Sequence, residues 1–294
     1  MQQEIFAVVG GDLRQAWLAG RLAERGSTVY SALLDREVEL SPRVHKTEGA
    51  AQAAAQAGVV VLPLPITADG IHLNAPFGRQ KLSLEELFPL LKGKLVLGGR
   101  TGGTPKELAQ KHGVELVDYF EREELAVLNS IPTAEGALEL AMAELPTTIF
   151  GTRVLITGFG RIARVLCRLL VAMGAQVTVA ARKYSDFVWI GIFGAEAVHV
   201  DALAEQAPRF DLVFNTVPAM LFDRRVLAAL PRDAVVIDLA SKPGGVDFET
   251  ARQMGVKTIW ALSLPGKVAP ISSGEAIKDT ILNILDERRD SLGQ

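Results

Sequence analysis

Short apolar runs recur along the chain, and each is followed by a turn and then by a segment whose apolar residues repeat with helical spacing. Runs of four or five apolar residues bounded by turns are typical of strands buried on both faces of a parallel sheet. In the first part of the sequence the predicted strands cover residues 5–9, 28–33, 59–63, 95–97 and 114–117. Helical patterns lie between them, over 13–25, 50–57 and 84–91. This alternation predicts a doubly wound α/β sheet.

The same alternation resumes later in the chain, where predicted strands cover residues 153–157, 177–180, 211–215, 234–239 and 257–260. We therefore expect two Rossmann-like domains with a ligand cleft between them. The predicted division is a substrate domain over residues 1–128, an interdomain helix over 129–146 and a nucleotide-binding domain over 147–273. A last helix over 274–294 is expected to pack back on the first domain.

The interdomain helix has signals at both ends. Proline is favoured in the first turn of a helix, so Pro132 or Thr133 is expected near its start, with Glu135 in the first turn. Pro146 stops the helix after about Glu144.

One strand–turn–helix segment carries a nucleotide-binding pattern. The residues Gly158-Phe159-Gly160-Arg161-Ile162-Ala163 fit G-x-G-x-x-A directly after an apolar strand, and a helical pattern follows them. In this pattern the first glycine permits the tight turn, the second lets the backbone approach a pyrophosphate, and the small third residue lets the helix lie close to the sheet. We expect residues 158–162 to contact a dinucleotide. The earlier turn Gly10-Gly11-Asp12 lacks this spacing and predicts no second nucleotide site.

The end of the next strand favours NADP over NAD. NAD enzymes place an acidic residue there for the ribose 2′-hydroxyl, but this chain has Ala180-Ala181-Arg182-Lys183 and no carboxylate before Asp186. A guanidinium can hold a 2′-phosphate through two parallel hydrogen bonds, and the lysine adds a second positive charge. The alternative interpretation of Arg182 and Lys183 is a solvated basic loop.

Composition narrows the class of protein. The chain has 294 residues, of which 49% are hydrophobic, and a net charge of −3, which gives no reason to expect nucleic-acid binding. Its one cysteine, Cys167, lies inside an amphipathic helix, and its four histidines lack metal-ligand spacing. No apolar run is long enough to span a membrane, and no secretion signal opens the sequence. We expect a cytoplasmic protein without a metal.

Several polar clusters follow predicted strands, and ligands of open α/β sheets bind beyond those strand ends. Four cations in these clusters, Arg14, Arg100, Lys242 and Lys267, suit a small substrate with carboxylate groups. Each cation alone is more often a surface charge, and only their common placement at strand ends favours a binding role. The segment Asn215-Thr216-Val217-Pro218 is expected beside the nicotinamide, where it positions the ring. The sequence identifies no catalytic acid or base.

The sequence resembles the A subunit of bacterial dipicolinate synthase nearly from end to end. The segments that carry the resemblance are VVGGDLRQ (8–15), NSIPTAEGAL (129–138), VLITGFGRIAR (154–164), FNTVPA (214–219), IDLASKPGGVDF (237–248) and LPGKVAPISSGEAI (264–277). NSIPTAEGA and LPGKVAP are the specific segments, because a general Rossmann enzyme needs neither. Ser130, within the first of these, joins the substrate-binding candidates. The segment Ile271-Ser272-Ser273 is a small departure from the family's pattern.

This resemblance implies a function in sporulating bacteria. It implies oxidation of dihydrodipicolinate to dipicolinate, on a branch of the diaminopimelate pathway in the mother-cell cytoplasm. It also implies that a flavoprotein-like B subunit is the partner, and we expect an oligomeric assembly. One alternative is another two-domain NADP-dependent dehydrogenase of the 2-hydroxyacid or shikimate type, although no histidine follows His199 where a 2-hydroxyacid enzyme places its catalytic one. The other alternative is a nucleotide-binding scaffold without catalytic activity.

Overall fold

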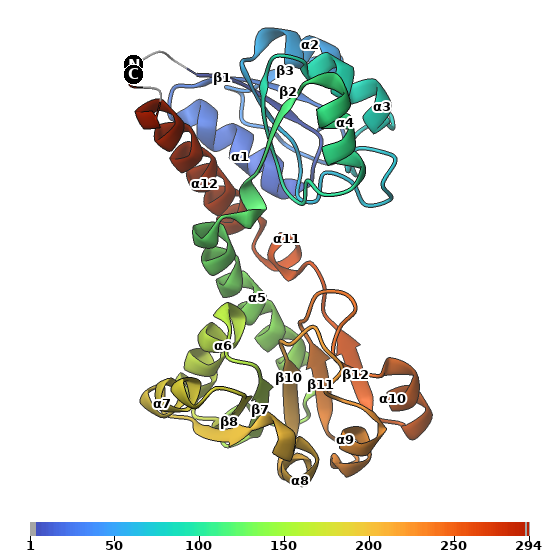
Figure 1. Cartoon of the computed structure of the whole chain (residues 1–294), viewed down its shortest axis with the longest axis vertical. Coiled ribbons are helices and arrows are strands. Elements are labelled where there is room, and N and C mark those ends of the chain that lie inside the picture. Colours follow the sequence, from blue (N-terminus) through green and yellow to red (C-terminus); the bar gives the residue numbers. More distant parts are fainter. Residues whose placement is uncertain (1–3, 292, 294) are drawn as a thin grey trace. The chain divides into compact units, whose positions relative to one another are not determined.

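The structure of the chain is a computed structural model that describes residues 4–291 and 293. It divides into two compact units, of which the first comprises Met1–Asn129 with Ala269–Gln294 and the second Ser130–Val268. Each unit contains a six-stranded sheet (Figure 1). All paired strands within the two sheets run parallel. The predicted class, two doubly wound α/β domains, is confirmed.

In the first sheet the strand order is β3-β2-β1-β4-β5-β6. Its strands are β1 (Ile5–Val9), β2 (Thr28–Ala32), β3 (His45–Lys46), β4 (Val59–Val61), β5 (Leu95–Gly98) and β6 (Glu115–Asp118). The helices of this unit are α1 (Leu13–Glu24), α2 (Ala50–Gln56), α3 (Leu84–Leu87), α4 (Thr104–His112) and α12 (Pro270–Ser291), with 3₁₀ turns η1 (Phe88–Leu91) and η2 (Tyr119–Glu121).

The alternation of side chains along β1 separates two hydrophobic cores. Phe6 and Val8 point to a core that α1 and α12 cover. Ala7 and Val9 point to the opposite core, which α2, α3 and α4 cover. Because a strand buried on both faces has no polar side, its sequence reads as a continuous apolar run, as predicted.

Helix α12 begins earlier than predicted, at Pro270 instead of residue 274, and lies along α1 (Figure 1). Gly274 allows this approach, because a Cβ atom added to it would lie 2.7 Å from the carbonyl oxygen of Arg14. Ile277, Ile281 and Ile284 enter the core beneath. The C-terminal helix is therefore part of the first unit.

The second sheet has the order β12-β11-β10-β7-β8-β9. Its strands are β7 (Arg153–Thr157), β8 (Gln176–Ala181), β9 (Glu196–His199), β10 (Leu212–Asn215), β11 (Val235–Asp238) and β12 (Lys257–Trp260). The helices are α6 (Arg161–Ala172), α7 (Tyr184–Ile192), α8 (Leu203–Gln206), α9 (Arg224–Ala229), α10 (Phe248–Met254) and α11 (Leu264–Val268), with 3₁₀ turns η3 (Val200–Ala202) and η4 (Ala207–Arg209). The strand order reverses between β7 and β10, because the chain crosses from β9 at one edge of the sheet to β10 beside β7.

Two layers of helices cover this sheet. Side chains from α6 and from the later part of α5 (Glu123–Glu144) share a core with Val154 and Ile156 of β7. Leu155 of the same strand points to the other core, which α8, α9 and α10 cover. Both faces of the strand are buried, as its apolar sequence predicts.

The predicted start of the connecting helix near Pro132 is wrong, because α5 begins at Glu123 and contains Pro132 in its interior. A proline inside a helix removes one intrahelical hydrogen bond and is normally avoided there. Here Glu123 and Glu124 lie in the first turn, where negative charge is favourable, and Leu125 is fully buried. The favourable charges in the first turn and the burial of Leu125 stabilise the turns of α5 that precede Pro132. The proline alone, as a local sequence signal, does not reveal them.

Candidate functional site

The glycine turn of the second unit has the geometry that its sequence predicts. Gly158 follows β7 with φ +86°, a left-handed conformation that glycine adopts without strain, and its N–H donates to the carbonyl of Ala180 at 2.9 Å. A Cβ atom added to Gly158 would lie 2.7 Å from Thr216 Oγ1 and 2.8 Å from Val217 Cγ2. The turn therefore lies directly against the loop that follows β10. Two of the predicted cofactor segments are brought together here.

Gly160 leaves space where a pyrophosphate is expected. It is the residue before α6, and a Cβ atom added to it would meet nothing within 4 Å. The first N–H groups of an α-helix, such as that of Ile162 in α6, have no carbonyl four residues earlier within the helix. Ala163 is fully buried against the sheet. An accessible helix N-terminus of this kind fits the pyrophosphate of a dinucleotide.

Phe159, between the two glycines, directs its side chain into the protein. Its ring is buried and lies edge-on to Phe193, with 5.6 Å between the centroids. The guanidinium of Arg164 lies 5.1 Å from the centroid of the same ring and donates from Nε to the Phe159 carbonyl at 3.1 Å. A cofactor contact from Phe159 therefore has to come from its backbone.

The predicted cofactor cations lie beside this turn in the sheet. Ala180 of β8 pairs with Thr157 of β7, so Arg182 and Lys183 follow the strand next to the glycine turn. Both side chains are exposed, and Lys183 immediately precedes α7. The structure thus places two solvent-accessible cations at the strand end where dinucleotide enzymes recognise the adenosine ribose.

The side chain of Asn215, predicted to contact the cofactor, is instead fully used within the protein. Its Oδ1 accepts from Thr157 Oγ1 at 2.6 Å and from Val217 N at 3.1 Å. Its Nδ2 donates to the Val217 carbonyl at 3.0 Å and to Asp238 Oδ1 at 2.7 Å. An amide has two acceptor and two donor positions, and all four are occupied. The loop can therefore offer a cofactor only its backbone and the neighbouring side chains, including Thr216 and Pro218.

Asp238 is a residue that the sequence interpretation missed. Its carboxylate is fully buried and accepts hydrogen bonds from the N–H groups of Ala240 at 2.9 Å and Gly245 at 2.8 Å as well as from Asn215. The sequence does contain one signal for this role, a single acidic residue at the end of the apolar strand Val235–Asp238. A carboxylate buried at such a place needs several hydrogen-bond donors, so it indicates a local hydrogen-bond network.

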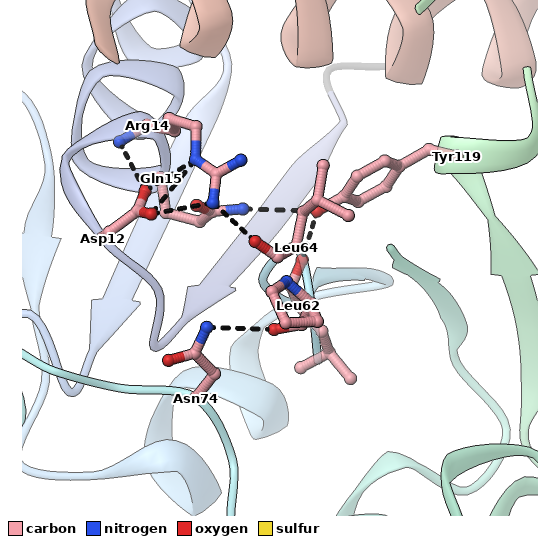
Figure 2. Close-up of polar contacts among 8 residues, drawn as sticks. Asp12, Arg14, Gln15, Leu62, Leu64, Asn74 and Tyr119 are labelled. Carbon is pink, nitrogen blue, oxygen red and sulfur yellow. Dashed lines mark hydrogen bonds and ion pairs between the residues drawn. The ribbon is translucent and has the colours of Figure 1, made fainter. Parts of the chain in front are cut away.

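At the carboxyl edge of the first sheet, Arg14 is held by its own neighbours (Figure 2). Its Nε and Nη2 bind both oxygens of Asp12 at 2.8–3.1 Å, and Nη2 also donates to the carbonyl of Leu64 at 2.5 Å. The side chain is only 11% exposed. In the described part of the chain Nη1 has no hydrogen-bond partner, which leaves two N–H donors at this edge.

A second set of hydrogen bonds joins Gln15, the residue after Arg14, to Tyr119 and Leu62 (Figure 2). The hydroxyl of Tyr119 donates to the Leu62 carbonyl at 2.9 Å and accepts from Gln15 Nε2 at 3.3 Å. Tyr119 is fully buried, and burial raises the pKa of its hydroxyl far above the ordinary range. The phenol therefore stays protonated and links α1 to the segment after β4.

Arg100 follows β5 in a left-handed conformation with φ +59°. Its N–H donates to Asp118 Oδ1 at 3.2 Å, and its exposed guanidinium lies 5.4 Å from the centroid of the Phe120 ring. Arg14 and Arg100 thus follow two strands of the same sheet, as predicted.

The other substrate-binding candidates lie in the second unit. Lys242 is exposed on the loop after β11, and Ser130 is buried within α5. The prediction that Lys267 belongs to a strand-end loop is wrong, because Leu264–Val268 forms helix α11. This helix lies against α5, where a Cβ atom added to Gly136 would be 3.1 Å from Val268 Cγ1.

Neither a metal centre nor a membrane span is found among the described residues. They contain no group of three or more acidic, histidine or cysteine residues arranged to hold a metal ion. Among the described helices, none combines the length and hydropathy that a membrane span requires.

The glycine turn of the second Rossmann-like unit indicates a nucleotide-binding enzyme, and a comparison with known protein families supports this class. The sequence profile of the D-isomer specific 2-hydroxyacid dehydrogenase NAD-binding domain matches residues 133–244. The chain is an NAD(P)-dependent oxidoreductase that uses a nicotinamide cofactor. The profile of the N-terminal domain of the dipicolinate synthase A subunit matches residues 5–120.

The full chain is similar to the dipicolinate synthase A subunit of Bacillus subtilis (strain 168), with 30% identity over 290 residues, 96% of this chain and 96% of the relative. The chain therefore belongs to the family of dipicolinate synthase A subunits. Its structure is similar to the crystal structure of the A subunit from Bacillus halodurans, with a TM-score of 0.88, 30% sequence identity, and coverage of 96% of this chain and 97% of the other. A transhydrogenase from Sinorhizobium meliloti shares the fold alone, at a TM-score of 0.71 and 16% identity over 97% of this chain and 94% of that one.

Proposed function

We propose that this chain oxidises dihydrodipicolinate to dipicolinate, with transfer of a hydride to NADP and in complex with a second protein. The observation that carries the proposal is the similarity to a dipicolinate synthase chain over 96% of both proteins, which includes the unit without a nucleotide motif. A similarity restricted to the nucleotide-binding domain would support only a general dehydrogenase.

In the proposed reaction the substrate loses one hydride, which the cofactor accepts, and one proton, which is released. Dihydrodipicolinate and NADP⁺ give dipicolinate, NADPH and H⁺, and the bound cofactor supplies the hydride acceptor. Formation of an aromatic ring favours loss of the hydride, so the protein has mainly to orient two rings and exclude competing reactions. The absence of an identifiable catalytic histidine is compatible with this chemistry.

The preference for NADP is supported by Arg182 and Lys183. Both are exposed at the end of β8, and Ala180 and Ala181 precede them where an NAD enzyme carries a carboxylate. An arginine that binds the 2′-phosphate through two N–H groups adds a charge-assisted contact that NAD lacks.

The substrate carries two carboxylates, which we propose are held by members of the set Arg14, Arg100, Ser130, Lys242 and Lys267. Arg14 is the best supported, because Asp12 and Leu64 fix its guanidinium while Nη1 stays available. A preoriented guanidinium loses little side-chain entropy on binding a carboxylate.

The partner in this proposal is a flavoprotein-like B subunit, needed for activity. The similar proteins of Bacillus subtilis and Bacillus halodurans are named as A subunits, which supports a complex with a second chain. We also propose that the complex is oligomeric and located in the cytoplasm.

The cofactor part is tested by calorimetric titration of NADP⁺ and NAD⁺ against the wild type and Arg182→Ala at fixed salt. We expect the wild type to prefer NADP⁺ and Arg182→Ala to reduce NADP⁺ affinity by about 10–100-fold, the usual range for a hydrogen bond to a charged group. The control is Arg168→Ala, which removes an exposed cation from the middle of α6 and should leave both affinities unchanged. Equal affinities in wild type and Arg182→Ala would refute the assignment.

The reaction is tested with enzymatically generated dihydrodipicolinate in the presence of the partner protein. We expect NADPH absorbance at 340 nm and dipicolinate to form in equal amounts. Binding of NADP⁺ without turnover would contradict the proposal and would identify the chain as a nucleotide-binding scaffold.

A further inference from the structure

Three neighbouring strand ends of the second unit are joined by one buried chain of hydrogen bonds. Thr157 at the end of β7 donates to Asn215 at the end of β10, and Asn215 donates to Asp238 at the end of β11, at 2.6 and 2.7 Å. All three residues are fully buried. Since water cannot replace a lost partner there, each bond fixes the next side chain in one orientation.

Asp238 extends this chain into the loop that follows β11. Its Oδ1 accepts from Ala240 N, two residues on, and its Oδ2 accepts from Gly245 N, seven residues on. The carboxylate thereby closes the segment from Leu239 to Gly245 into a fixed loop. This loop carries Lys242, one of the proposed substrate cations.

Gly245 connects the two loops at this edge of the sheet. Its carbonyl accepts from the N–H groups of Leu221 and Phe222 at 3.0 and 2.9 Å. A Cβ atom added to it would lie 2.6 Å from the Val217 carbonyl oxygen and 2.8 Å from that of Ala219. Asp238 therefore holds Gly245, and Gly245 in turn holds the loop from Thr216 to Phe222.

We propose that Asp238 is a positioning residue for the nicotinamide half of the cofactor. The inference rests on the proposed function. In a Rossmann sheet of this order, the dinucleotide crosses the strand ends, with the adenosine beyond the half that contains β8 and the nicotinamide beyond the half that contains β10. Both loops that Asp238 orders follow strands of the nicotinamide half. Because the Asn215 side chain is fully used, the cofactor contacts have to come from the backbone of these loops and from neighbouring side chains such as Thr216 and Pro218.

The substitution Asp238→Asn tests the proposal with little change of volume. An amide turns its NH₂ group either toward the Gly245 N–H or toward both Asn215 Nδ2 and the Ala240 N–H, which are themselves donors, so at least one attachment of the loop after β11 is lost. We expect the Kd for NADP⁺ to rise about tenfold or more in calorimetry, whereas the Kd for adenosine 2′,5′-bisphosphate, which lacks the nicotinamide half, stays within about twofold. If Asp238 served only to stabilise the fold, the substitution would leave both Kd values unchanged in the folded protein or raise both by the same factor.

Two companion variants complete the test. Thr157→Val removes one of the two donors to Asn215 Oδ1, but the Val217 N–H still holds that oxygen and the bonds of Asp238 to Ala240 and Gly245 stay in place. It should therefore lower the melting temperature without changing the Kd for NADP⁺. The exchange Asn215→Asp with Asp238→Asn restores a hydrogen bond between the two side chains with donor and acceptor reversed. Because residue 215 then no longer donates to the Val217 carbonyl, the exchange should recover stability but not NADP⁺ affinity. It also supplies a folded protein if Asp238→Asn alone does not fold, and in that case its selective weakening of NADP⁺ binding, with the bisphosphate unaffected, is the expected result.

The outcomes separate this inference from the proposed function. If the wild type binds neither NADP⁺ nor the bisphosphate, the cofactor proposal fails and the positioning role fails with it. If the wild type binds both and Asp238→Asn weakens both equally, or if Thr157→Val weakens NADP⁺ as much as Asp238→Asn does, only the positioning role is overturned. Selective weakening of NADP⁺ by Asp238→Asn supports it.

Discussion

Replacement of Gly245 by alanine should be among the most damaging single-methyl additions in the second unit. The added Cβ atom would lie 2.6 Å from the Val217 carbonyl oxygen and 2.8 Å from that of Ala219, and it would also meet the Asn215 amide. The Asn215 amide donates to the Val217 carbonyl and to Asp238, so neither of these two groups can move away without breaking a bond. Gly245 itself is buried.

The expected loss of stability has two parts. Overpacking in a dense interior typically costs about 1–3 kcal/mol. A displaced Gly245 N–H also leaves Asp238 short of one donor, and a hydrogen bond to a charged group is worth roughly 1.5–3 kcal/mol. A shift of the loop that relieves the overpacking is the same shift that weakens the bond from Gly245 to Asp238, so the two costs do not add in full. We expect a total loss of about 3 kcal/mol in the free energy of unfolding. For a domain of this size that corresponds to a fall in Tm of about 10 °C.

The assay is thermal and urea unfolding followed by tryptophan emission. Trp260 reports on the loop directly, since its Nε1 donates to the Ala240 carbonyl at 3.0 Å. The matched control is Gly191→Ala in α7, where an added Cβ atom would meet nothing within 4 Å. The same methyl group there should stabilise the helix by about 0.5–1 kcal/mol. If Gly245→Ala unfolds within about 0.5 kcal/mol of the wild type, the loop is not rigid and the steric reasoning is refuted.

Other contacts in the second unit support three more predictions. Gly158→Ala should lower both stability and nucleotide affinity because of its positive φ, whereas Gly160→Ala should keep the melting temperature and lose at least about tenfold in NADP⁺ affinity by calorimetry. Burial raises the pKa of the Cys167 thiol to about 11, so a disulfide reagent at pH 8 should label it only after denaturation. The hydrogen bond from Arg209 holds the pKa of Glu196 below its ordinary 4.5, so this carboxylate stabilises the fold above that pH and the effect is lost as the pH falls through the lowered pKa. The variant Glu196→Gln should lose less unfolding free energy than the wild type when the pH is lowered, as measured in urea titrations. The difference should be at most about 0.5 kcal/mol, because the Glu196–Arg209 pair is half-exposed.

The strand–turn–helix order and the glycine turn could be predicted because their signals are local. The run 153–157 reads as a buried strand, and a G-x-G-x-x-A turn requires glycine only for its own backbone and for close approach. The polar strand-end clusters, including the one that contains Lys242, could be predicted in the same way, because they directly follow apolar runs. These are features that neighbouring residues determine.

The connecting helix and the role of Asn215 could not be predicted, because both depend on contacts between distant segments. Pro132 is a strong local stop signal, yet α5 continues through it. Asn215 ends its strand as a binding residue would, but its partners Thr157 and Asp238 come from two other strands. Only the assembled sheet shows that its hydrogen-bonding capacity is already used.

The two units show why a shared fold does not give two nucleotide sites. Helix α1 begins at Leu13, directly after Asp12, whose carboxylate accepts from the Arg14 N–H and pairs with the Arg14 guanidinium, so the helix start already holds an anionic group of the protein. A Cβ atom added to Gly11 would lie 2.6 Å from Gln15 Cγ. Helix α6 begins after Gly160, which has no side chain and faces open space. The first turn is therefore already filled by side chains of the protein, while the second is open to an anion. The difference lies in a few residues at the helix starts, and it favours the second unit as the site of the dinucleotide.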